Sequence, residues 1–491
     1  MSIGGCRLKY LSIYTIILEK EKQIEPKGGA KMEKLNVCLV NDSFPPEIDG
    51  VANAVVNYAG IINESYGSAT VVTPSNPQAD DSAFPFPVCR YPSLDTTRLV
   101  GYRAGLPFSP EIQRRLDRRD FNIIHSHCPV SSTLLARLLR ERIDAPLVMT
   151  YHTKFDIDIA KAISSKLLQE EAKRILVENI SACDEVWTVS RGAGENLRSL
   201  GYEGDYLIMP NGVDLPRGRV EEEQVAQACR DYDLPQGVPV FLFLGRMMWY
   251  KGIRIILDGL KKLADSGRDF RMVFVGGGTD RDEIVEYSRK LGLEGRVFFC
   301  PAIHDRNIVR AWYCRADLFL FPSSFDTNGL VVREAAACGL ASVLIRGSCA
   351  AEDVDDGETG FLIEENGDSM AEKLETLCQC PETVKRVGEQ AQSRLYISWE
   401  EAVGKACRRY ETVIENYRRG LYPQHEGLND DFIRAMSNSM ESWDEYRERQ
   451  RKKLLELKQE YRERKEEMRE EMNSSLQKLR ENIAQYFERF M

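Results

Sequence analysis

Two acidic residues bracket the start of one helix in the second half of the chain. Asp326 and Glu334 have seven residues between them. The apolar run 318–321 before them predicts a buried strand, and residues 329–338 predict a helix. Backbone N–H groups at such a helix start attract phosphate or sugar hydroxyls, because they lack partners and the helix dipole favours an electron-rich ligand. A plain strand-turn-helix with a capping Asp or Asn fits the stretch equally well.

Two cations follow another predicted strand, 239–244. Arg246 and Lys251 are five residues apart and come directly after Gly245, where the strand ends. Cations at the edge of a crevice could hold a diphosphate and stabilise its charge as it leaves. An Arg and a Lys in this position are more often ordinary surface charges.

Two glycine positions and a histidine pair add weaker signals. Gly50 lies in the long loop 41–52 after the first strand and could let backbone donors approach a phosphate. The turn 275–281 lacks the G-x-G-x-x-G spacing, so it is more typical of a tight strand-helix turn than of a dinucleotide site. His125 and His127 end a predicted strand, where alternate residues face opposite sides. We therefore expect one of them to be packed and the other exposed to a crevice.

The elements that position these residues are short apolar strands separated by helix-length segments. The predicted strands are 36–40, 69–73, 122–125, 147–151, 186–189 and 206–209, then 239–244, 272–275, 297–300, 318–321, 341–345 and 361–363. Strands that are apolar throughout predict parallel sheets covered on both faces. Two such sets predict two doubly wound domains, over residues 32–215 and 216–397, with a ligand pocket between them.

The chain continues beyond these domains into two further helical segments. Residues 398–419 predict one helix, and residues 428–491 predict a long, charged helix that could form a coiled coil. Its apolar residues make a narrow stripe from 443 to 487, and residues 441–471 hold 10 basic and 11 acidic side chains. This stripe favours self-association or a partner over packing along the body of the protein.

Composition limits the function classes. The chain has 491 residues and a net charge of −10, which argues against nonspecific nucleic-acid binding. Its 13 Cys form no CxxC pair and its five His have no zinc-ligand spacing, so we expect no metal site and a reduced, cytoplasmic protein. Residues 1–31 make a poor signal peptide and predict a non-native or disordered leader, with translation starting at Met32.

In combination, these motifs resemble the retaining glycosyltransferases of family 4 over about residues 34–418. The resemblance implies an α/β protein of the GT-B fold, in which two Rossmann-like domains face each other. It implies that Glu334 binds the ribose hydroxyls of a nucleotide-sugar donor. Asp326 and the amides of Asn328, Gly329 and Leu330 would hold the transferred sugar.

The remaining matches fall on both domains. The resemblance implies that Arg246 and Lys251 bind the diphosphate, that Gly50 belongs to the glycine loop of the first domain, and that His127 lies near the sugar. Two departures from the family pattern leave the donor open: Asp326 is one methylene shorter than the usual Glu, and Pro301 stands where a Gly is common.

Three segments look similar to the diacylglycerol glucosyltransferase branch: residues 102–107, 151–153 and 326–330. They suggest a lipid or lipid-linked acceptor. Residues 90–142 hold 10 Arg against 5 acids, so the segment 98–119 could contact anionic lipid on the inner face of a membrane. A solvated basic helix explains the same residues.

The sequence therefore predicts a hexosyltransferase that uses a nucleotide-diphosphate sugar, with UDP expected as the nucleotide. The resemblance implies retention, an α-linkage and no cofactor or metal. Two alternatives stay open: a non-catalytic nucleotide-sugar sensor that acts through the C-terminal helix, and a sugar-nucleotide epimerase of the same fold.

Overall fold

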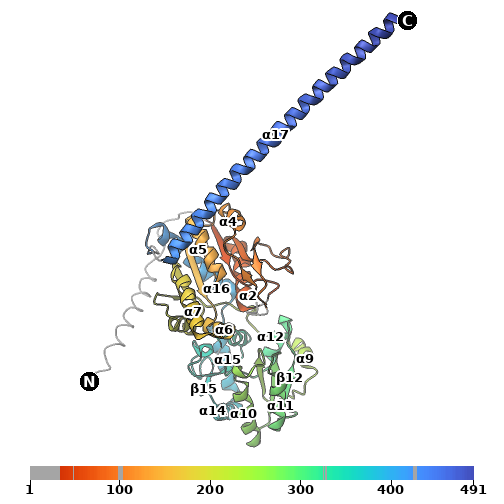
Figure 1. Ribbon diagram of the computed structural model, residues 1–491. Coiled ribbons are helices and arrows are strands. Elements are labelled where there is room, and N and C mark those ends of the chain that lie inside the picture. Colours follow the sequence, from red (N-terminus) through yellow and green to blue (C-terminus); the bar gives the residue numbers. More distant parts are fainter. Residues whose placement is uncertain are drawn as a thin grey trace, which may run out of the picture.

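The computed structural model describes residues 34–47, 49–97, 103–324, 326, 329–423 and 428–490. The predicted leader, residues 1–31, lies outside these ranges. Figure 1 shows two α/β lobes stacked one on the other, with one long helix projecting from the first lobe.

The first lobe is built on a seven-stranded parallel sheet in the order β3-β2-β1-β6-β7-β8-β9. The strands are β1 (Leu35–Val40), β2 (Gly67–Pro74), β3 (Val88–Tyr91), β6 (Ile123–Ser126), β7 (Leu147–Tyr151), β8 (Glu185–Thr188) and β9 (Leu207–Ile208). A short antiparallel pair lies beside it, β4 (Ser93–Leu94) and β5 (Ala104–Gly105). The helical segments are α2 (Gly50–Ile61), the π-turn η1 (Ile62–Tyr66), α4 (Pro110–Asp117), α5 (Ser131–Ile143), α6 (Phe155–Ala162), α7 (Lys166–Ser181) and α8 (Arg191–Ser199).

The second lobe has a six-stranded parallel sheet in the order β12-β11-β10-β13-β14-β15. The strands are β10 (Val240–Leu244), β11 (Arg271–Val275), β12 (Val297–Cys300), β13 (Leu318–Leu320), β14 (Ser342–Ile345) and β15 (Phe361–Ile363). The helical segments are α9 (Glu222–Cys229), η2 (Trp249–Lys251), α10 (Ile253–Asp265), α11 (Arg281–Lys290), α12 (Arg306–Arg315), α13 (Leu330–Ala337), η3 (Cys349–Ala351), α14 (Gly367–Cys378) and α15 (Pro381–Arg394).

Helix α16 (Trp399–Arg418) follows the second lobe but packs on the first. It begins with a capping box, in which Ser398 and Glu401 satisfy each other's backbone N–H groups. Trp399 is buried in the same core cluster as the strands and helix that open the first lobe. Its indole Nε1 donates to Asp214 at 2.7 Å, and Asn53 of α2 donates to the same carboxylate at 3.0 Å. The chain therefore crosses back to its first lobe at this point.

Helix α17 (Leu428–Phe490) has 63 residues and touches the body only near its start. Ile433 is buried, the ring of Phe432 lies 6.3 Å from that of Phe108, and Arg434 pairs with Glu141 of α5 at 3.7 Å. At 1.5 Å per residue the helix is roughly 95 Å long. Most of it therefore extends away from both lobes (Figure 1).

The predicted fold class is confirmed, and each of the twelve predicted strands is present within a residue or two of its predicted bounds. Strand β3 was missed because Pro85, Pro87 and Pro92 surround it, and proline is typical of turns and sheet edges. β3 is indeed an edge strand of its sheet.

Candidate active site

The carboxyl ends of β10 and β13 lie side by side, because these strands are parallel neighbours. This pairing brings the two predicted charged motifs together. The ammonium of Lys251 lies 2.5 Å from Asp326 Oδ1, and the hydroxyl of Ser323 donates to Oδ2 of the same carboxylate at 2.6 Å. Lys251 is buried, with 7% of its surface exposed. A predicted diphosphate-binding cation and a predicted sugar-binding acid thus neutralise each other.

Arg246 lies two residues beyond the end of β10, at the same carboxyl edge of the sheet. Burial raises the pKa of the Tyr250 hydroxyl. The positive charge of Arg246 lowers this pKa and the negative charge of Asp326 raises it, so both charges act on the same hydroxyl. Arg246 is exposed and forms no ion pair with any carboxylate that the structure describes. Its charge is therefore available to an anionic ligand at this edge of the sheet.

Glu334 is held by two residues that the sequence reasoning missed. Arg306, the first residue of α12, donates to Oε1 at 2.5 Å, and the hydroxyl of Tyr313 donates to Oε2 at 2.9 Å. Burial and the carboxylate of Glu334 raise the pKa of Tyr313 well above its usual value, so its hydroxyl stays protonated. The carboxylate is thus fixed in orientation in the second turn of α13.

Gly329 directly precedes α13 and has a left-handed backbone, with φ of +55°. A Cβ there would lie 3.0 Å from Ala350 Cα, so the turn itself requires glycine. Leu330 begins the helix, and Gly339, with φ of +72°, follows its end as predicted. Asn328 lies outside the described residues.

In the first lobe, Gly50 opens α2, and a Cβ at Gly50 would meet no atom within 4 Å. The fold therefore does not demand a glycine here, which leaves room for a ligand. The side chain of Asp49 accepts hydrogen bonds from the N–H groups of Val51 and Ala52, at 2.8 and 2.7 Å. An anion would have to displace Asp49 to reach these two donors.

The histidine pair differs from the prediction, because both side chains are buried: His125 is 0% and His127 is 2% exposed. The strand ends at Ser126, so the alternation of faces is lost and the two rings lie 4.0 Å apart. His127 Nδ1 is hydrogen-bonded to Nε2 of His152 at 3.0 Å, and its own Nε2 has no partner among the described residues. His125 is joined to Tyr410 of α16 at 2.5 Å.

Burial holds the pKa of all three histidines below the usual value of 6.5, with the pKa of His152 at about 3. The rings are therefore neutral at pH 7. In the hydrogen bond between His127 and His152, one ring donates its N–H and the other accepts. His152 consequently determines whether the unpartnered nitrogen of His127 carries a proton.

The glycine-rich turn after β11 has a structural role. A Cβ at Gly276 would lie 2.0 Å from the carbonyl oxygen of Gly245, and one at Gly278 would lie 2.2 Å from that of Met247. The turn therefore packs backbone to backbone against the segment that leads to the predicted cations.

A cleft of about 500 Å³ separates the two lobes beside η2. Its lining residues are Lys154, Asp156 and Asn196 of the first lobe and Trp249, Tyr250, Gly252, Arg254, Ile255, Pro322, Ser324 and Glu365 of the second. The lobes also touch directly, where Glu352 accepts hydrogen bonds from the N–H groups of Arg191 and Gly192, at 2.5 and 2.9 Å, at the start of α8. A carboxylate of one lobe thus caps a helix of the other.

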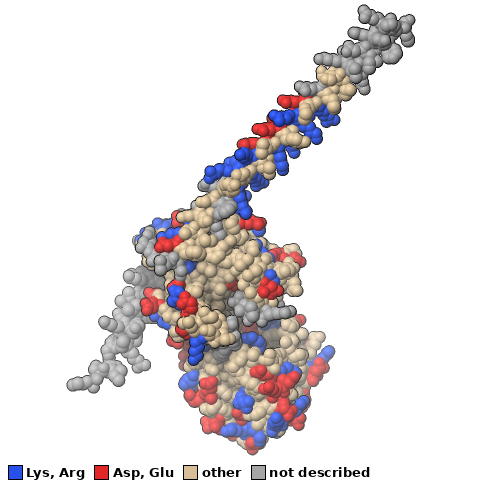
Figure 2. Space-filling model, viewed as in Figure 1, with Lys and Arg blue, Asp and Glu red and all other residues tan. Residues whose placement is uncertain are grey.

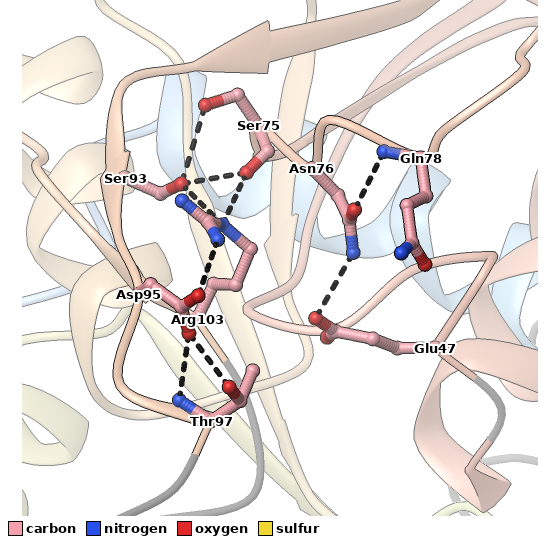
Figure 3. A network of polar contacts seen from close by, with 8 residues as sticks. All are labelled: Glu47, Ser75, Asn76, Gln78, Ser93, Asp95, Thr97 and Arg103. Carbon is pink, nitrogen blue, oxygen red and sulfur yellow. Dashed lines mark hydrogen bonds and ion pairs between the residues drawn. The ribbon is translucent and has the colours of Figure 1, made fainter.

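Arg103, directly before β5, connects the residue after β2 with β4 (Figure 3). Its Nε donates to the carbonyl of Ser75 at 2.9 Å and to Ser93 Oγ at 3.0 Å. Its guanidinium also lies 3.5 Å from Asp95. In this part of the predicted lipid-contact segment 98–119, Arg103 is therefore engaged internally, while Arg115 and Arg118 are exposed. Residues 98–102 lie outside the described ranges.

No three His, Cys, Asp or Glu side chains form a metal-binding group within the described ranges. No described helix is both long enough and apolar enough to cross a membrane.

Two facing doubly wound lobes with a cleft between them define the GT-B class. A family model described as "Glycosyltransferase Family 4" matches residues 48–217, and one described as "Glycosyl transferases group 1" matches residues 227–394. Together the two matches span more than half of the chain. This chain therefore belongs to the family 4 glycosyltransferases and is an enzyme of the hexosyltransferase type.

Related proteins agree with this assignment. The chain is 28% identical over 337 residues to a D-inositol 3-phosphate glycosyltransferase of Nocardia farcinica, a match that covers 65% of this chain and 72% of the relative. The corresponding Corynebacterium glutamicum protein is 27% identical over 335 residues, which are 65% of this chain and 78% of the relative.

Solved structures share the fold at low sequence identity. Sucrose-phosphate synthase of Thermosynechococcus elongatus aligns with a TM-score of 0.62 at 19% identity, covering 78% of this chain and 100% of that one. Anabaena Alr3699/HepE in complex with UDP aligns with a TM-score of 0.60 at 17% identity, covering 77% and 100%.

Proposed function

We propose that this enzyme transfers a hexose from a UDP-sugar to an acceptor hydroxyl with retention, giving an α-linkage from an α-donor. The observation that carries the proposal is the cluster of Arg246, Lys251 and Asp326 at the carboxyl edge of the second sheet, beside the cleft between the lobes. UDP is favoured as the nucleotide because the Anabaena protein of the same fold was solved with UDP and with UDP-glucose.

In this proposal the donor's diphosphate lies between Arg246 and Lys251. Asp326, released from its contact with Lys251, accepts hydrogen bonds from the sugar hydroxyls. Glu334, oriented by Arg306 and Tyr313, accepts from the ribose. The two cations oppose the negative charge that grows on the diphosphate as the bond to the sugar breaks.

The reaction breaks the bond between the sugar C1 and the diphosphate oxygen and forms a bond between C1 and the acceptor oxygen on the same face. The acceptor proton passes to the departing diphosphate, so no side chain is needed as general base. The protein contributes positioning and electrostatic stabilisation. The unpartnered nitrogen of His127 would then contact the sugar from the first lobe.

The acceptor has two proposed classes. The names of the related proteins suggest an inositol phosphate, and the motifs at 102–107, 151–153 and 326–330 suggest a lipid hydroxyl. Both present a hydroxyl near an anionic or amphipathic group.

The test is release of UDP from UDP-glucose by the full chain, with inositol 3-phosphate or diacylglycerol as the acceptor. We expect UDP release to depend on one of these acceptors. Donor binding without turnover in the presence of either would favour the sensor, and conversion of UDP-glucose to another UDP-sugar without any acceptor would favour the epimerase.

A further inference from the structure

One carboxylate of the second lobe joins it to the first. The two oxygens of Glu352 accept hydrogen bonds from the backbone N–H groups of Arg191 and Gly192 at the start of α8, at 2.5 and 2.9 Å. Figure 2 shows acidic side chains, in red, over much of the visible surface of the second lobe. Glu352 differs from an exposed acid, because its side chain is only 13% exposed and its partners belong to the other lobe. It therefore helps to hold the lobes in contact.

The first turn of α8 depends on this carboxylate. The side chain of Ser190 accepts a hydrogen bond from the N–H group of Ala193 at 3.0 Å. The N–H groups of Arg191 and Gly192 have Glu352 as their only hydrogen-bond partner among the described residues. Free N–H groups at a helix start attract negative charge. The charge of Glu352 therefore favours the arrangement in which the two lobes touch.

The main chains of the two lobes also approach closely at this point. A Cβ at Gly192 would lie 2.2 Å from Sγ of Cys349, the first residue of η3. Gly192 lies within α8, where alanine would suit the helix better than glycine. The missing side chain therefore serves the contact between the lobes and not the helix.

Residues 349–353, which we call the bridge segment, also touch the start of α13. A Cβ at Gly329 would lie 3.0 Å from Ala350 Cα, so the two backbones pack directly on each other. Asp353 accepts a hydrogen bond from Arg333 of α13 at 2.6 Å. The bridge segment therefore contacts α8 of the first lobe and α13 of the second at the same time.

We propose that Glu352 is a positioning residue for sugar transfer, because its contact with α8 fixes the bridge segment and, through it, the start of α13. This inference rests on the proposed function, in which Gly329, Leu330 and Glu334 bind the donor. When the lobes separate, water replaces Glu352 at the N–H groups of α8, and the bridge segment loses its restraint from the first lobe. The donor is thus held for reaction only while the two lobes touch.

A purely local role for Glu352 makes a different prediction. A carboxylate that only capped α8 would affect α8 when removed and leave α13 unchanged. Residues 329–333 distinguish the two roles, because Glu352 forms no hydrogen bond or ion pair with them in the part of the chain that the structure describes.

The experiment is hydrogen exchange of the backbone amides in the full chain. In Glu352→Gln, the side-chain amide can accept from only one of the two N–H groups of α8. We expect exchange to become about tenfold faster both at the start of α8 and at residues 329–333. Glu358→Gln is the control, because this exposed acid pairs with Arg394 of its own lobe, and it should exchange like the wild type.

Two glycines supply a second, independent pair of variants. Gly192→Ala places a methyl group against Cys349, whereas a Cβ at Gly60 of α2 would meet no atom within 4 Å. We expect Gly192→Ala to speed exchange at residues 329–333 and Gly60→Ala to leave it unchanged. Adding Cys349→Ala to Gly192→Ala should recover part of the loss, because the nearest remaining atom is then Cβ at 3.1 Å. Circular dichroism of each variant establishes that the fold is retained.

Kinetics with a UDP-sugar and an acceptor complete the test. A contact made only when the lobes close contributes to kcat more than to KM. We expect kcat to fall about tenfold in Glu352→Gln and in Gly192→Ala, with a smaller change in the KM for the donor. The controls Glu358→Gln and Gly60→Ala should match the wild type.

The exchange measurement separates this proposal from the proposed function, because it needs no turnover. Faster exchange at α8 with unchanged exchange at residues 329–333 would overturn the role proposed for Glu352. An unchanged kcat in both Glu352→Gln and Gly192→Ala would do the same. Faster exchange at both places in a protein that releases no UDP with any acceptor would instead refute the proposed function and leave the coupling between the lobes intact.

Discussion

The two lobes differ in the polar groups that surround their predicted site residues. The second lobe presents charges in close pairs, Lys251 with Asp326 and Arg306 with Glu334. The first lobe holds three buried imidazoles, those of His125, His127 and His152. Burial lowers their pKa values, so these rings are neutral. A charged ligand such as a diphosphate is bound best by charged side chains, and an uncharged sugar by neutral hydrogen-bonding groups. The difference suggests separate roles for the lobes, in which the second holds the leaving group and the first lines the reacting sugar.

We expect the largest loss of activity from a substitution at Lys251. Lys251→Ala removes a cation from the diphosphate site and leaves Asp326 without its partner. We expect kcat/KM for the UDP-sugar to fall by about 10²–10³-fold, as for loss of one strong electrostatic contact in an active site. Steady-state kinetics measures this. Lys261→Ala is the control, because this partly exposed lysine of α10 pairs only with Asp265 of its own helix among the ion pairs of the described residues. A Lys251→Ala enzyme as active as that control would show that the charge of Lys251 is not needed for donor use.

The three neutral histidines of the first lobe predict that the stability of the protein depends on pH. The folded pKa of each of the three histidines lies below the unfolded value of about 6.5, so the unfolded chain binds more protons as pH falls. Their contribution is fully present above pH 6.5 and is lost as pH falls toward the folded pKa values.

Urea denaturation should accordingly show a loss of roughly 2 kcal/mol between pH 7.5 and pH 6.0 from these three groups. His127→Gln combined with His152→Gln should remove about two thirds of that slope. An unchanged slope in the double variant would mean that folding does not lower the pKa of these two rings.

A substitution at Glu334 tests the second charged pair of the second lobe. Glu334→Gln keeps the shape of the side chain but weakens its hydrogen bonds to a ribose and to Arg306. We expect the KM for the donor to rise by about tenfold, with a smaller change in kcat, as for loss of a charge-assisted hydrogen bond. Glu286→Gln, exposed on α11, serves as the control. A fall confined to kcat would instead assign Glu334 to the transition state.

His152 should give the smallest effect, because it acts through His127. His152→Ala removes the hydrogen bond that fixes the proton position on His127, and we expect kcat to fall by up to about tenfold. His152→Gln can restore a hydrogen bond and should recover part of the loss. Equal rates in the two variants would show that His152 serves packing alone.

The sequence allowed prediction of the parts that depend on local pattern. The apolar strands, their parallel sheets and the helix that Gly339 follows all come from periodicity and the rules of parallel sheets. The pairing of β10 with β13, which brings Lys251 to Asp326 across 75 positions, was not predicted. The role predicted for Glu334 comes from spacing and resemblance and stays a prediction.

Partners fixed only by packing could not be predicted. Arg306 is 28 residues from Glu334 and His152 is 25 residues from His127, with no motif connecting either pair. Glu352 caps α8 across the lobes at a separation of 160 residues or more. The prediction that one histidine is exposed failed because the strand ends at Ser126 and the ring of His127 is buried against His152. The self-association predicted for residues 443–487 and the lipid contact predicted for 98–119 stay predictions.

We propose above that Lys251 and Arg246 bind the diphosphate of the donor. Isothermal titration of uridine and of UDP into the wild type and into Lys251→Ala tests it most directly, because the two ligands differ only in the diphosphate. We expect UDP to bind the wild type at least about tenfold more tightly than uridine, because the diphosphate makes one or two charge-assisted contacts. We expect most of this difference to disappear in Lys251→Ala, while uridine binds both proteins equally. An undiminished preference for UDP in Lys251→Ala would show that Lys251 does not bind the diphosphate.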